Sequence, residues 1–257
     1  MSVFPKTDIQ KTIPGINILL DPTYLLGEGE VLPADGASIS SWKDTLQNQL
    51  NADNGTGAEQ PLFKTEISGL NPMVLFDGID DVLEIPSSSV IDDLYDGGGS
   101  FLFVIYPTSD GGNSQGRLFS QGGGNSYIYL SDEAGGVCRI SLYKNFSTTQ
   151  GEWETTSLDV NIGQPNIIFI SYDQDSVSND PLIYVNSKTS SSLTEVSTPI
   201  GAATASAVLR IGNSATTSRS FDGYIGDVLF SKGRILSEGD RNNLIDSASN
   251  KYGIELI

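Results

Sequence analysis

Short apolar runs recur along the chain and are separated by clusters of Gly, Asn, Asp and Ser. The runs are rich in Val, Ile, Phe and Tyr, which fit the pleated surface of a β-strand, whereas the small polar residues between them favour tight turns. This pattern predicts an all-β fold, a two-sheet antiparallel β-sandwich, with one main domain over residues 15–257. The predicted strands cover residues 71–85, 100–109, 116–123, 126–131, 137–144, 165–173, 181–188, 207–214 and 221–231.

Ten large apolar residues within these runs are predicted to be buried, on both faces of the strands. A sandwich of this kind can cover the outer face of a sheet with loops or with a terminal helix, so both faces contribute to the core. The predicted core residues are Phe76, Phe101, Phe103, Ile168, Ile183, Val185, Leu209, Ile211, Ile225 and Phe230.

The C-terminal segment has a helical period instead. Ser237 with an acidic residue three positions later resembles a capping box, and apolar residues then recur at a spacing of four at Leu244, Ala248 and Tyr252. Gly253 follows as a stop signal. We expect a short C-terminal helix that packs on the sandwich.

The segment FDGYIGDVLFS, residues 221–231, places one acid in an unusual position. Strict alternation puts Ile225, Asp227 and Leu229 on one face of the strand, so the carboxylate lies between two large apolar side chains. Asp227 is either a catalytic acid in a cleft or a polar residue of a sandwich without catalytic function. It has no acidic partner two positions away on the same strand.

The composition excludes several functions. The chain has 257 residues, 32 acidic and 14 basic, for a net charge of −18, and such a field repels nucleic acid. The absence of histidine excludes Ser-His-Asp and Cys-His catalysis and His-ligated zinc. The single cysteine, Cys138, is predicted to be a small core residue.

No segment approaches the roughly 20 apolar residues of a membrane span, and no secretory signal is recognisable at the start. We therefore expect synthesis in a cytosol and no membrane insertion.

Two groups of acids are candidates for site chemistry. Glu152 and Glu154 flank Trp153 and have the alternate spacing of a glycosidase carboxylate pair, although a solvated strand is the simpler interpretation. Asp173, Asp175 and Asp180 could offer oxygen ligands to Ca²⁺, but Asp residues also form ordinary turns. We therefore predict no catalytic residues, no metal site and no cofactor, with a structural calcium as an open alternative.

Three aromatic residues are candidates for binding sugars. Tyr127 and Tyr129 alternate on one side of a strand that follows a glycine-rich turn, and Trp153 is bracketed by acids. Aromatic rings exposed near loops can stack on sugar rings. The alternative is that the tyrosines pack against a neighbouring strand.

Residues 1–14 are predicted to form an N-terminal arm separate from the sandwich. They carry two lysines and one acid and show no strand or helix period. Such an arm could dock Val3, Phe4 and Ile9 into a groove on a partner or a neighbouring copy. A frayed terminus without a role is the alternative.

The order of motifs along residues 15–257 resembles the concanavalin A-like, laminin-G-type jelly roll. The segments that carry the resemblance are FDGIDDVLEI, FLFVIYP, IIFISYD, IYVNSK, LRIGNS, FDGYIGDVLFS and LSEGDRNNLIDSASNKYGI. The resemblance implies a jelly-roll sandwich with a short closing helix. Families of this fold include glucanases, lectin-like binders and structural modules, so the fold does not choose among these functions.

Two functional interpretations follow. The first is a non-catalytic virion protein, similar to the jelly rolls that decorate phage heads or form fibres and tails, displayed on the virion surface. Its partners would be other virion proteins, copies of itself or cell-surface polysaccharide. The second is a bacterial polysaccharide-acting enzyme or carbohydrate-binding module. The lack of a catalytic constellation favours the first.

Overall fold

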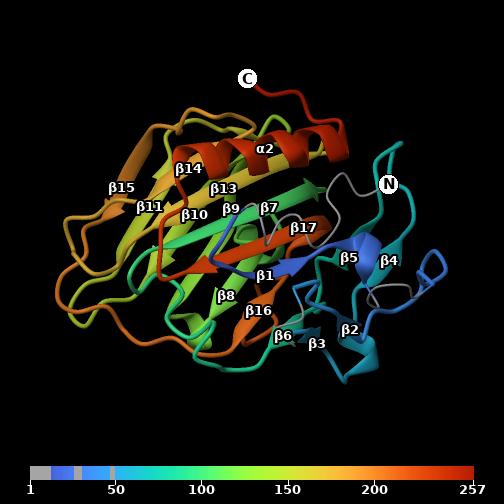
Figure 1. The fold of residues 1–257 in the computed structure, drawn as a ribbon, viewed down its shortest axis with the longest axis horizontal. Helices are drawn as coiled ribbons and strands as arrows, with labels where there is room; N and C mark the ends of the chain where they lie inside the picture. Colours follow the sequence, from blue (N-terminus) through green and yellow to red (C-terminus); the bar gives the residue numbers. More distant parts are fainter. Residues whose placement is uncertain (1–12, 26–30, 47–49) are drawn as a thin grey trace.

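A computed structural model describes residues 13–25, 31–46 and 50–257 of the chain. Within these residues, two antiparallel sheets pack face to face as a sandwich, and one α-helix lies across the outer face of one sheet (Figure 1). The predicted all-β sandwich with a C-terminal helix is therefore confirmed.

The first sheet, called sheet A, has the strand order β14-β13-β7-β17-β5-β4, and β1 also pairs with β17. The long strand β17 contacts three other strands and forms the centre of this sheet. In chain order, the strands of sheet A are β1 (Ile16–Leu20), β4 (Leu62–Lys64), β5 (Met73–Asp77), β7 (Gly99–Pro107), β13 (Asn166–Tyr172), β14 (Leu182–Val185) and β17 (Asp222–Lys232).

The second sheet, called sheet B, has the order β15-β11-β10-β9-β8-β16-β6-β3-β2, and β12 also pairs with β10. In chain order, its strands are β2 (Ser41–Trp42), β3 (Ala52–Asp53), β6 (Leu83–Ile85), β8 (Arg117–Gln121), β9 (Ser126–Ala134), β10 (Val137–Lys144), β11 (Gly151–Thr155), β12 (Val160–Asn161), β15 (Leu193–Ser197) and β16 (Leu209–Ile211). Short 3-10 turns lie at Pro22–Tyr24, Gly57–Glu59, Gly112–Ser114 and Gly122–Gly124.

The sequence segment 71–85, predicted as one strand, is divided between the two sheets. Its first part is β5 in sheet A and its last part is β6 in sheet B. The acidic loop between them begins at Gly78, whose φ of +75° suits glycine, and a Cβ there would lie 2.8 Å from the side chain of Asp222. The turn therefore carries the chain from one layer of the sandwich to the other.

The core has two parts. The larger lies between the sheets, and the smaller lies between sheet A and α2 (Glu238–Tyr252). All ten residues predicted to be buried are at most 2% exposed, and Cys138 is also buried, as predicted. Both faces of β13 are buried. Ile168 and Ile170 face the inter-sheet core, whereas Ile167 and Phe169 face α2.

The helix α2 has the ends that the sequence predicts. The Ser237 hydroxyl accepts a hydrogen bond from the amide of Asp240, and Gly253 closes the helix with φ of +64°. Leu244, Ala248 and Tyr252 are buried against sheet A. None of the helices in the described part of the chain is long and apolar enough to span a membrane.

The predicted face of β17 is wrong at one point. Ile225 lies opposite Ile105 and Val228 lies opposite Phe103, so β17 carries one extra residue over this stretch and forms a β-bulge. Ile225 faces the inter-sheet core, whereas Leu229 faces α2. The bulge breaks the alternation on which the prediction was based.

Most of the predicted N-terminal arm, including Val3, Phe4 and Ile9, lies outside the described residues. Ile13, which the sequence assigns to the arm, is 4% exposed and belongs to the core beneath α2.

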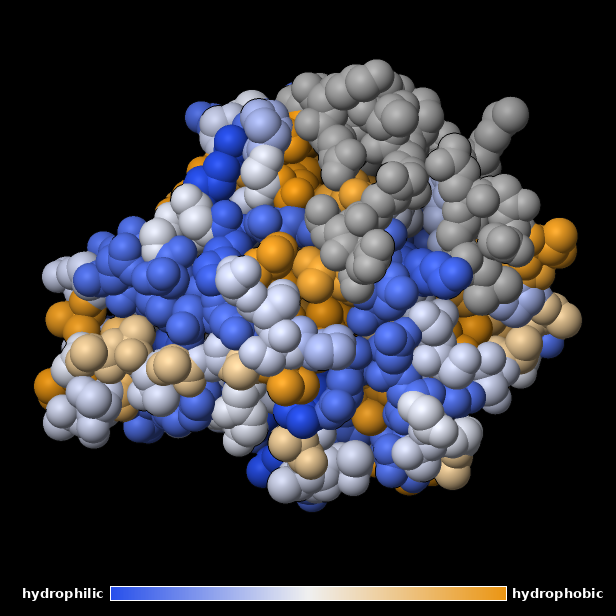
Figure 2. Space-filling view, turned by 60° about the horizontal axis from the view of Figure 1, so that its bottom comes forward, coloured by the Kyte–Doolittle hydropathy of each residue, from blue (hydrophilic) through white to orange (hydrophobic). Residues whose placement is uncertain are grey.

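Residues on the face seen in Figure 2 are largely hydrophilic, with apolar residues in small separate patches.

Candidate functional site

The outer face of sheet B carries aromatic and charged side chains in rows across four strands. Alternation along β9 turns Ile128 and Leu130 into the core, so Tyr127 and Tyr129 point outward. The strand register then places Tyr127 opposite Tyr143 of β10.

The same register extends each row to neighbouring strands. Tyr143 lies opposite Glu152 of β11, and Tyr129 lies opposite Arg117 of β8. Residues far apart in the sequence therefore meet on one surface. Arg117, Tyr127, Tyr129, Tyr143 and Glu152 are called the Tyr–Arg cluster below.

Stacking holds the centre of the Tyr–Arg cluster together. The rings of Tyr127 and Tyr143 are nearly parallel, at 8°, with centroids 4.3 Å apart. The guanidinium carbon of Arg117 lies 3.5 Å from the centroid of the Tyr127 ring, which is a cation–π contact. Tyr127 is thus held on one side by a cation and on the other by an aromatic ring.

The tyrosine hydroxyls of the cluster are hydrogen-bond donors at neutral pH. Burial raises the pKa of Tyr127 to about 12 and also raises the pKa of Tyr129 and Tyr143. The Tyr129 hydroxyl donates to Glu152 Oε1 at 2.6 Å, and the Tyr143 hydroxyl donates to Asn145 Oδ1 at 2.6 Å. The surface therefore combines aromatic area with oriented polar groups.

Of the three aromatic residues predicted to bind sugars, only Tyr127 retains partial exposure. Trp153 is 1% exposed, because its position on β11 turns the indole into the inter-sheet core, where Nε1 donates to Asp180 Oδ1 at 2.8 Å. The prediction of an exposed Trp153 is therefore wrong. Tyr129 is 5% exposed, and it belongs to the cluster as packing for Tyr127 and as the donor to Glu152.

The sequence patterns did not identify Arg117 and Tyr143 as site residues. Alternation along β10 indicates that Tyr143 points the same way as Ser141 and Arg139, so its outward direction could have been predicted. Its contact with Tyr127 depends on the pairing of β9 with β10. No sequence signal places Arg117, because β8 contains a register shift between Arg117 and Phe119.

The two glutamates of β11 do point outward together, on a strand that lies inside sheet B rather than at its edge. Glu152 accepts the hydrogen bond from Tyr129, and Glu154 forms an ion pair with Arg139 at 2.9 Å. Asp132 also lies 3.4 Å from Arg139. Both glutamates are thus bound to neighbouring side chains.

The acids Asp173, Asp175 and Asp180, weighed above as possible calcium ligands, do not gather around a common point. Asp173 accepts a hydrogen bond from the amide of Asp175, Asp175 accepts one from the amide of Gly97, and Asp180 binds the Trp153 indole. These are turn and packing contacts of the kind that Asp commonly makes.

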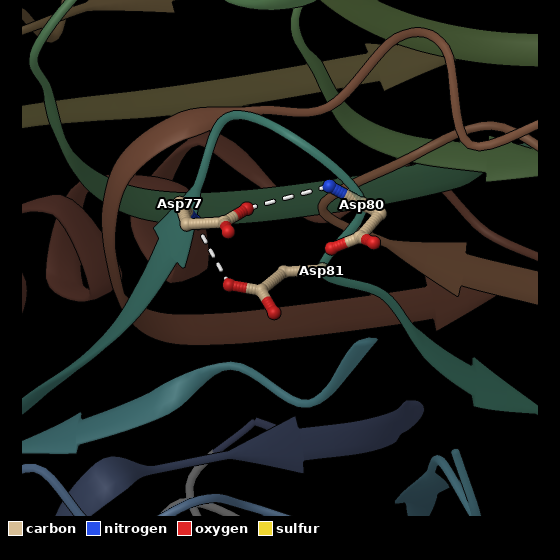
Figure 3. Close-up of side chains that lie close together, drawn as sticks. All are labelled: Asp77, Asp80 and Asp81. Atoms are coloured by element: carbon tan, nitrogen blue, oxygen red, sulfur yellow. Dashed lines mark hydrogen bonds between the residues drawn. The ribbon is translucent and has the colours of Figure 1, made fainter. Parts of the chain in front are cut away.

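A different acidic group has the donor set for a hard cation. Asp77, Asp80 and Asp81, in the loop between β5 and β6, bring carboxylate oxygens within 4.8 Å of one another (Figure 3). Asp77 Oδ1 accepts a hydrogen bond from the amide of Asp80, and Asp81 Oδ2 accepts one from the amide of Asp77. Burial and the neighbouring acids raise the pKa of Asp81 to about 6. Carboxylate oxygens suit Ca²⁺, but the hydrogen bonds within the loop also account for these positions.

Asp227 is a structural residue. Its Oδ1 accepts hydrogen bonds from Lys251 Nζ at 2.7 Å and from the Tyr252 hydroxyl at 2.9 Å, beneath α2. Lys251 Nζ also binds Asp21 Oδ1 at 2.8 Å. Burial, together with the nearby Asp21 carboxylate, raises the pKa of Asp227 to about 6. This acid joins the N-terminal segment, β17 and the helix, and its place beneath α2 does not suit a substrate cleft.

Comparison with known families agrees with this architecture. Residues 77–239 match the laminin G-type family described as the concanavalin A-like lectin/glucanases superfamily. The matched region covers more than half of the chain, so the protein belongs to this superfamily. No curated protein sequence matches the chain.

Several solved structures share the fold at low sequence identity. The binding domain of Paraclostridial Mosquitocidal Protein 1 is similar with a TM-score of 0.60 and 14% identity over 92% of this chain and 53% of that one. The ligand binding domain of botulinum neurotoxin serotype D, in complex with N-acetylneuraminic acid, has a TM-score of 0.54 and 10% identity over 93% of this chain and 52% of that one.

An enzyme also shares the fold. The Trypanosoma rangeli sialidase in complex with the inhibitor DANA has a TM-score of 0.54 and 11% identity over 89% of this chain and 32% of that one. The present chain thus spans about half of the two toxin structures and a third of the sialidase. At these identities the likeness concerns the fold alone, and both binding domains and an enzyme are represented.

Proposed function

We propose that the protein is a non-catalytic carbohydrate-binding module and that the Tyr–Arg cluster on the outer face of sheet B is its binding surface. The observation that carries the proposal is the partly exposed Tyr127–Tyr143 stack, flanked by Arg117 and by the Tyr129–Glu152 hydrogen bond. Aromatic surface bordered by fixed polar groups suits a sugar, which presents C–H groups on its faces and hydroxyls at its edges.

Membership of a superfamily that includes lectins is consistent with this proposal. The toxin domain bound to N-acetylneuraminic acid adds a precedent for sugar binding in a protein with a similar fold. Neither fact locates a site on this chain, so the Tyr–Arg cluster itself has to be tested.

Binding without catalysis is supported by the contacts of the candidate catalytic acids, each of which is bound to a neighbouring side chain. Glu152 and Glu154 are bound to Tyr129 and Arg139, and Asp227 is held beneath α2 on the other sheet. A glycosidase pair requires one carboxyl group to transfer a proton and another to act as base or nucleophile at the scissile bond. The chain also has no histidine that could replace either role.

The binding proposal is tested by replacing Tyr143 with Ala and measuring affinity for a panel of immobilised polysaccharides. Loss of one ring of the stack should weaken binding at least tenfold for any glycan that the wild type retains. The matched control is Tyr106→Ala in the Tyr106–Tyr224 pair of sheet A, whose ring centroids are 5.7 Å apart. Equal affinity of wild type and the Tyr143 variant would contradict the proposed site, and no retention of any glycan would contradict the proposed function.

The non-catalytic part is tested by assaying release of reducing ends from laminarin, agarose, carrageenan, alginate and xylan. No release is expected. Turnover that is lost in Glu152→Gln or Glu154→Gln would overturn this part while leaving carbohydrate binding intact.

For the biological setting, we propose display on the surface of a phage particle, as a head decoration, fibre or tail component. The net charge of −18 supports this setting, because like-charged particles repel one another and stay dispersed. Mass spectrometry of purified virions from the source should find the chain. Deleting residues 2–12 should abolish incorporation with little change in melting temperature, and full incorporation of this variant would exclude the N-terminal arm as the attachment point.

A further inference from the structure

Arg117 is a cation in an unusual environment. The residue is 8% exposed, and its Nε has no hydrogen-bond partner among the residues that the structure describes. Nη1 has only a long contact of 3.5 Å to the Ser120 hydroxyl. Desolvation lowers the pKa of the guanidinium, which remains protonated because arginine starts from so high a value.

The other arginines show how unusual this is. The chain contains six, and four of them form ion pairs with acids of the chain. These four are Arg139, Arg210, Arg234 and Arg241. Within the described residues, no carboxylate oxygen lies within 4 Å of a guanidinium nitrogen of Arg117 or Arg219, although the chain has 32 acids from which a partner could come.

Arg117 and Arg219 lie side by side. The amide of Arg117 donates to the backbone carbonyl of Arg219 at 3.0 Å, and the positive charge of Arg219 further lowers the pKa of Arg117. The Arg219 guanidinium is tied to the backbone carbonyl of Asn113 through Nη1. The positive charges of Arg117 and Arg219 both oppose the rise in the pKa of Tyr127, so both lie near this ring of the stack.

A buried cation without a counter-ion is costly, because neither water nor a protein anion compensates its charge. An anion from outside would remove this cost. The planar guanidinium suits a carboxylate or sulfate, which it can bind through two parallel hydrogen bonds. The contact with the Tyr127 ring already restrains the Arg117 guanidinium, so little side-chain freedom would be lost on binding.

We propose that Arg117 and Arg219 bind the carboxylate or sulfate group of an acidic saccharide while the tyrosine stack contacts its ring. This inference rests on the proposed carbohydrate-binding function and names the class of sugar. The carboxylate and sulfate sources share one chemistry and are separated by experiment.

The test compares polysaccharides that differ in charge but share a backbone or a closely related one. Polygalacturonate is compared with its methyl ester for the carboxylate, and carrageenan with agarose for the sulfate, at constant ionic strength. The wild type should bind at least one acidic polymer at least tenfold more tightly than its neutral counterpart, and the better of the two identifies the anionic group.

Arg117→Gln and Arg219→Gln should each lower affinity for that acidic polymer at least tenfold, and this loss should exceed any loss of affinity for the neutral polymer. Arg219 is the safer of the two for folding, because it is only partly buried. The matched control is Arg241→Gln. Arg241, a residue of α2, also lies over a tyrosine ring, 4.4 Å from the centroid of Tyr184 in sheet A, but it has Glu238 as a partner. It should bind like the wild type.

The outcomes separate the two proposals. Equal binding of acidic and neutral polymers would overturn the acidic-sugar inference and leave the carbohydrate-binding function standing. Selective binding of the acidic polymer that both arginine variants retain would overturn the assignment to Arg117 and Arg219. Failure to bind any of the four polymers would overturn the inference, and the wider glycan panel would then decide the proposed function.

Discussion

The outer faces of the two sheets differ in whether a buried positive charge is paired with carboxylates. On sheet A, the helix α2 covers the strands, and Lys251 is held between the carboxylates of Asp21 and Asp227. On sheet B, Arg117 lies over Tyr127 away from α2, and within the described residues no carboxylate forms an ion pair with it. Lys251 is enclosed by its own chain and is neutralised by protein carboxylates. The charge of Arg117, which faces outward from sheet B, is left available to an anionic ligand.

The difference extends to the aromatic residues. Tyr252, the last residue of α2, is packed so tightly against sheet A that a Cβ on Gly226 would lie 2.8 Å from its hydroxyl. On sheet B, Tyr127 and Tyr143 stack in the open and are partly exposed. Packing on sheet A therefore serves stability, while the same residue type on sheet B is left available for contact.

The largest effect should come from removing the enclosed cation. Lys251→Met leaves two acids without their counter-ion in a site where the lysine side chain is 5% exposed. The free energy of unfolding should fall by about 3–5 kcal/mol, measured by urea denaturation.

The matched control is Lys188→Met, which removes the exposed pair with Asp246 and should cost at most about 1 kcal/mol. A Lys251 variant as stable as this control would mean that the two carboxylates do not depend on the lysine.

An intermediate effect should appear as a pH dependence. Unfolded Asp ionises near pH 4, at about 3.9, whereas the pKa of Asp227 in the fold is about 6. Between these values the unfolded chain loses its proton first, so stability present at pH 4 is lost as the pH rises to 6. Between pH 4 and pH 6 the free energy of unfolding should fall by about 2 kcal/mol more in the wild type than in Asp227→Asn, measured by urea denaturation at each pH.

This substitution isolates the titration because both hydrogen bonds, from Lys251 and Tyr252, go to Oδ1, which an amide oxygen can replace. Asp81, whose pKa is also raised to about 6, contributes in the same direction and remains in both proteins. Equal pH dependence of wild type and variant would show that Asp227 does not titrate in this range.

The smallest effect should follow removal of the outward-facing cation. Arg117→Met loses the cation–π contact with Tyr127 but also removes an unpaired buried charge, so stability should change by less than about 1 kcal/mol. Thermal and urea unfolding would measure this change. A loss as large as that of the Lys251 variant would show that Arg117 is needed to hold the fold together.

The fold class and most of the core follow from the amino-acid sequence alone. Apolar runs such as 100–109 and 165–173 are buried on both faces, so their identity as core strands does not depend on knowing which face is which. The helix ends at Ser237 and Gly253 were equally predictable, because capping depends on residues a few positions apart.

Which side chains meet depends on the pairing of strands in the folded protein. The bulge in β17 moved Ile225 and Leu229 to opposite faces, and a register shift in β8 set the position of Arg117 beside Tyr127. Alternation is a local property, but register is set by pairing between strands that are distant in sequence, and one extra residue reverses the face of everything beyond it. For this reason the sequence indicated Trp153 as a surface ring, while the fold buried it and placed Tyr143 and the largely buried Arg117 against Tyr127 on the outer face of sheet B.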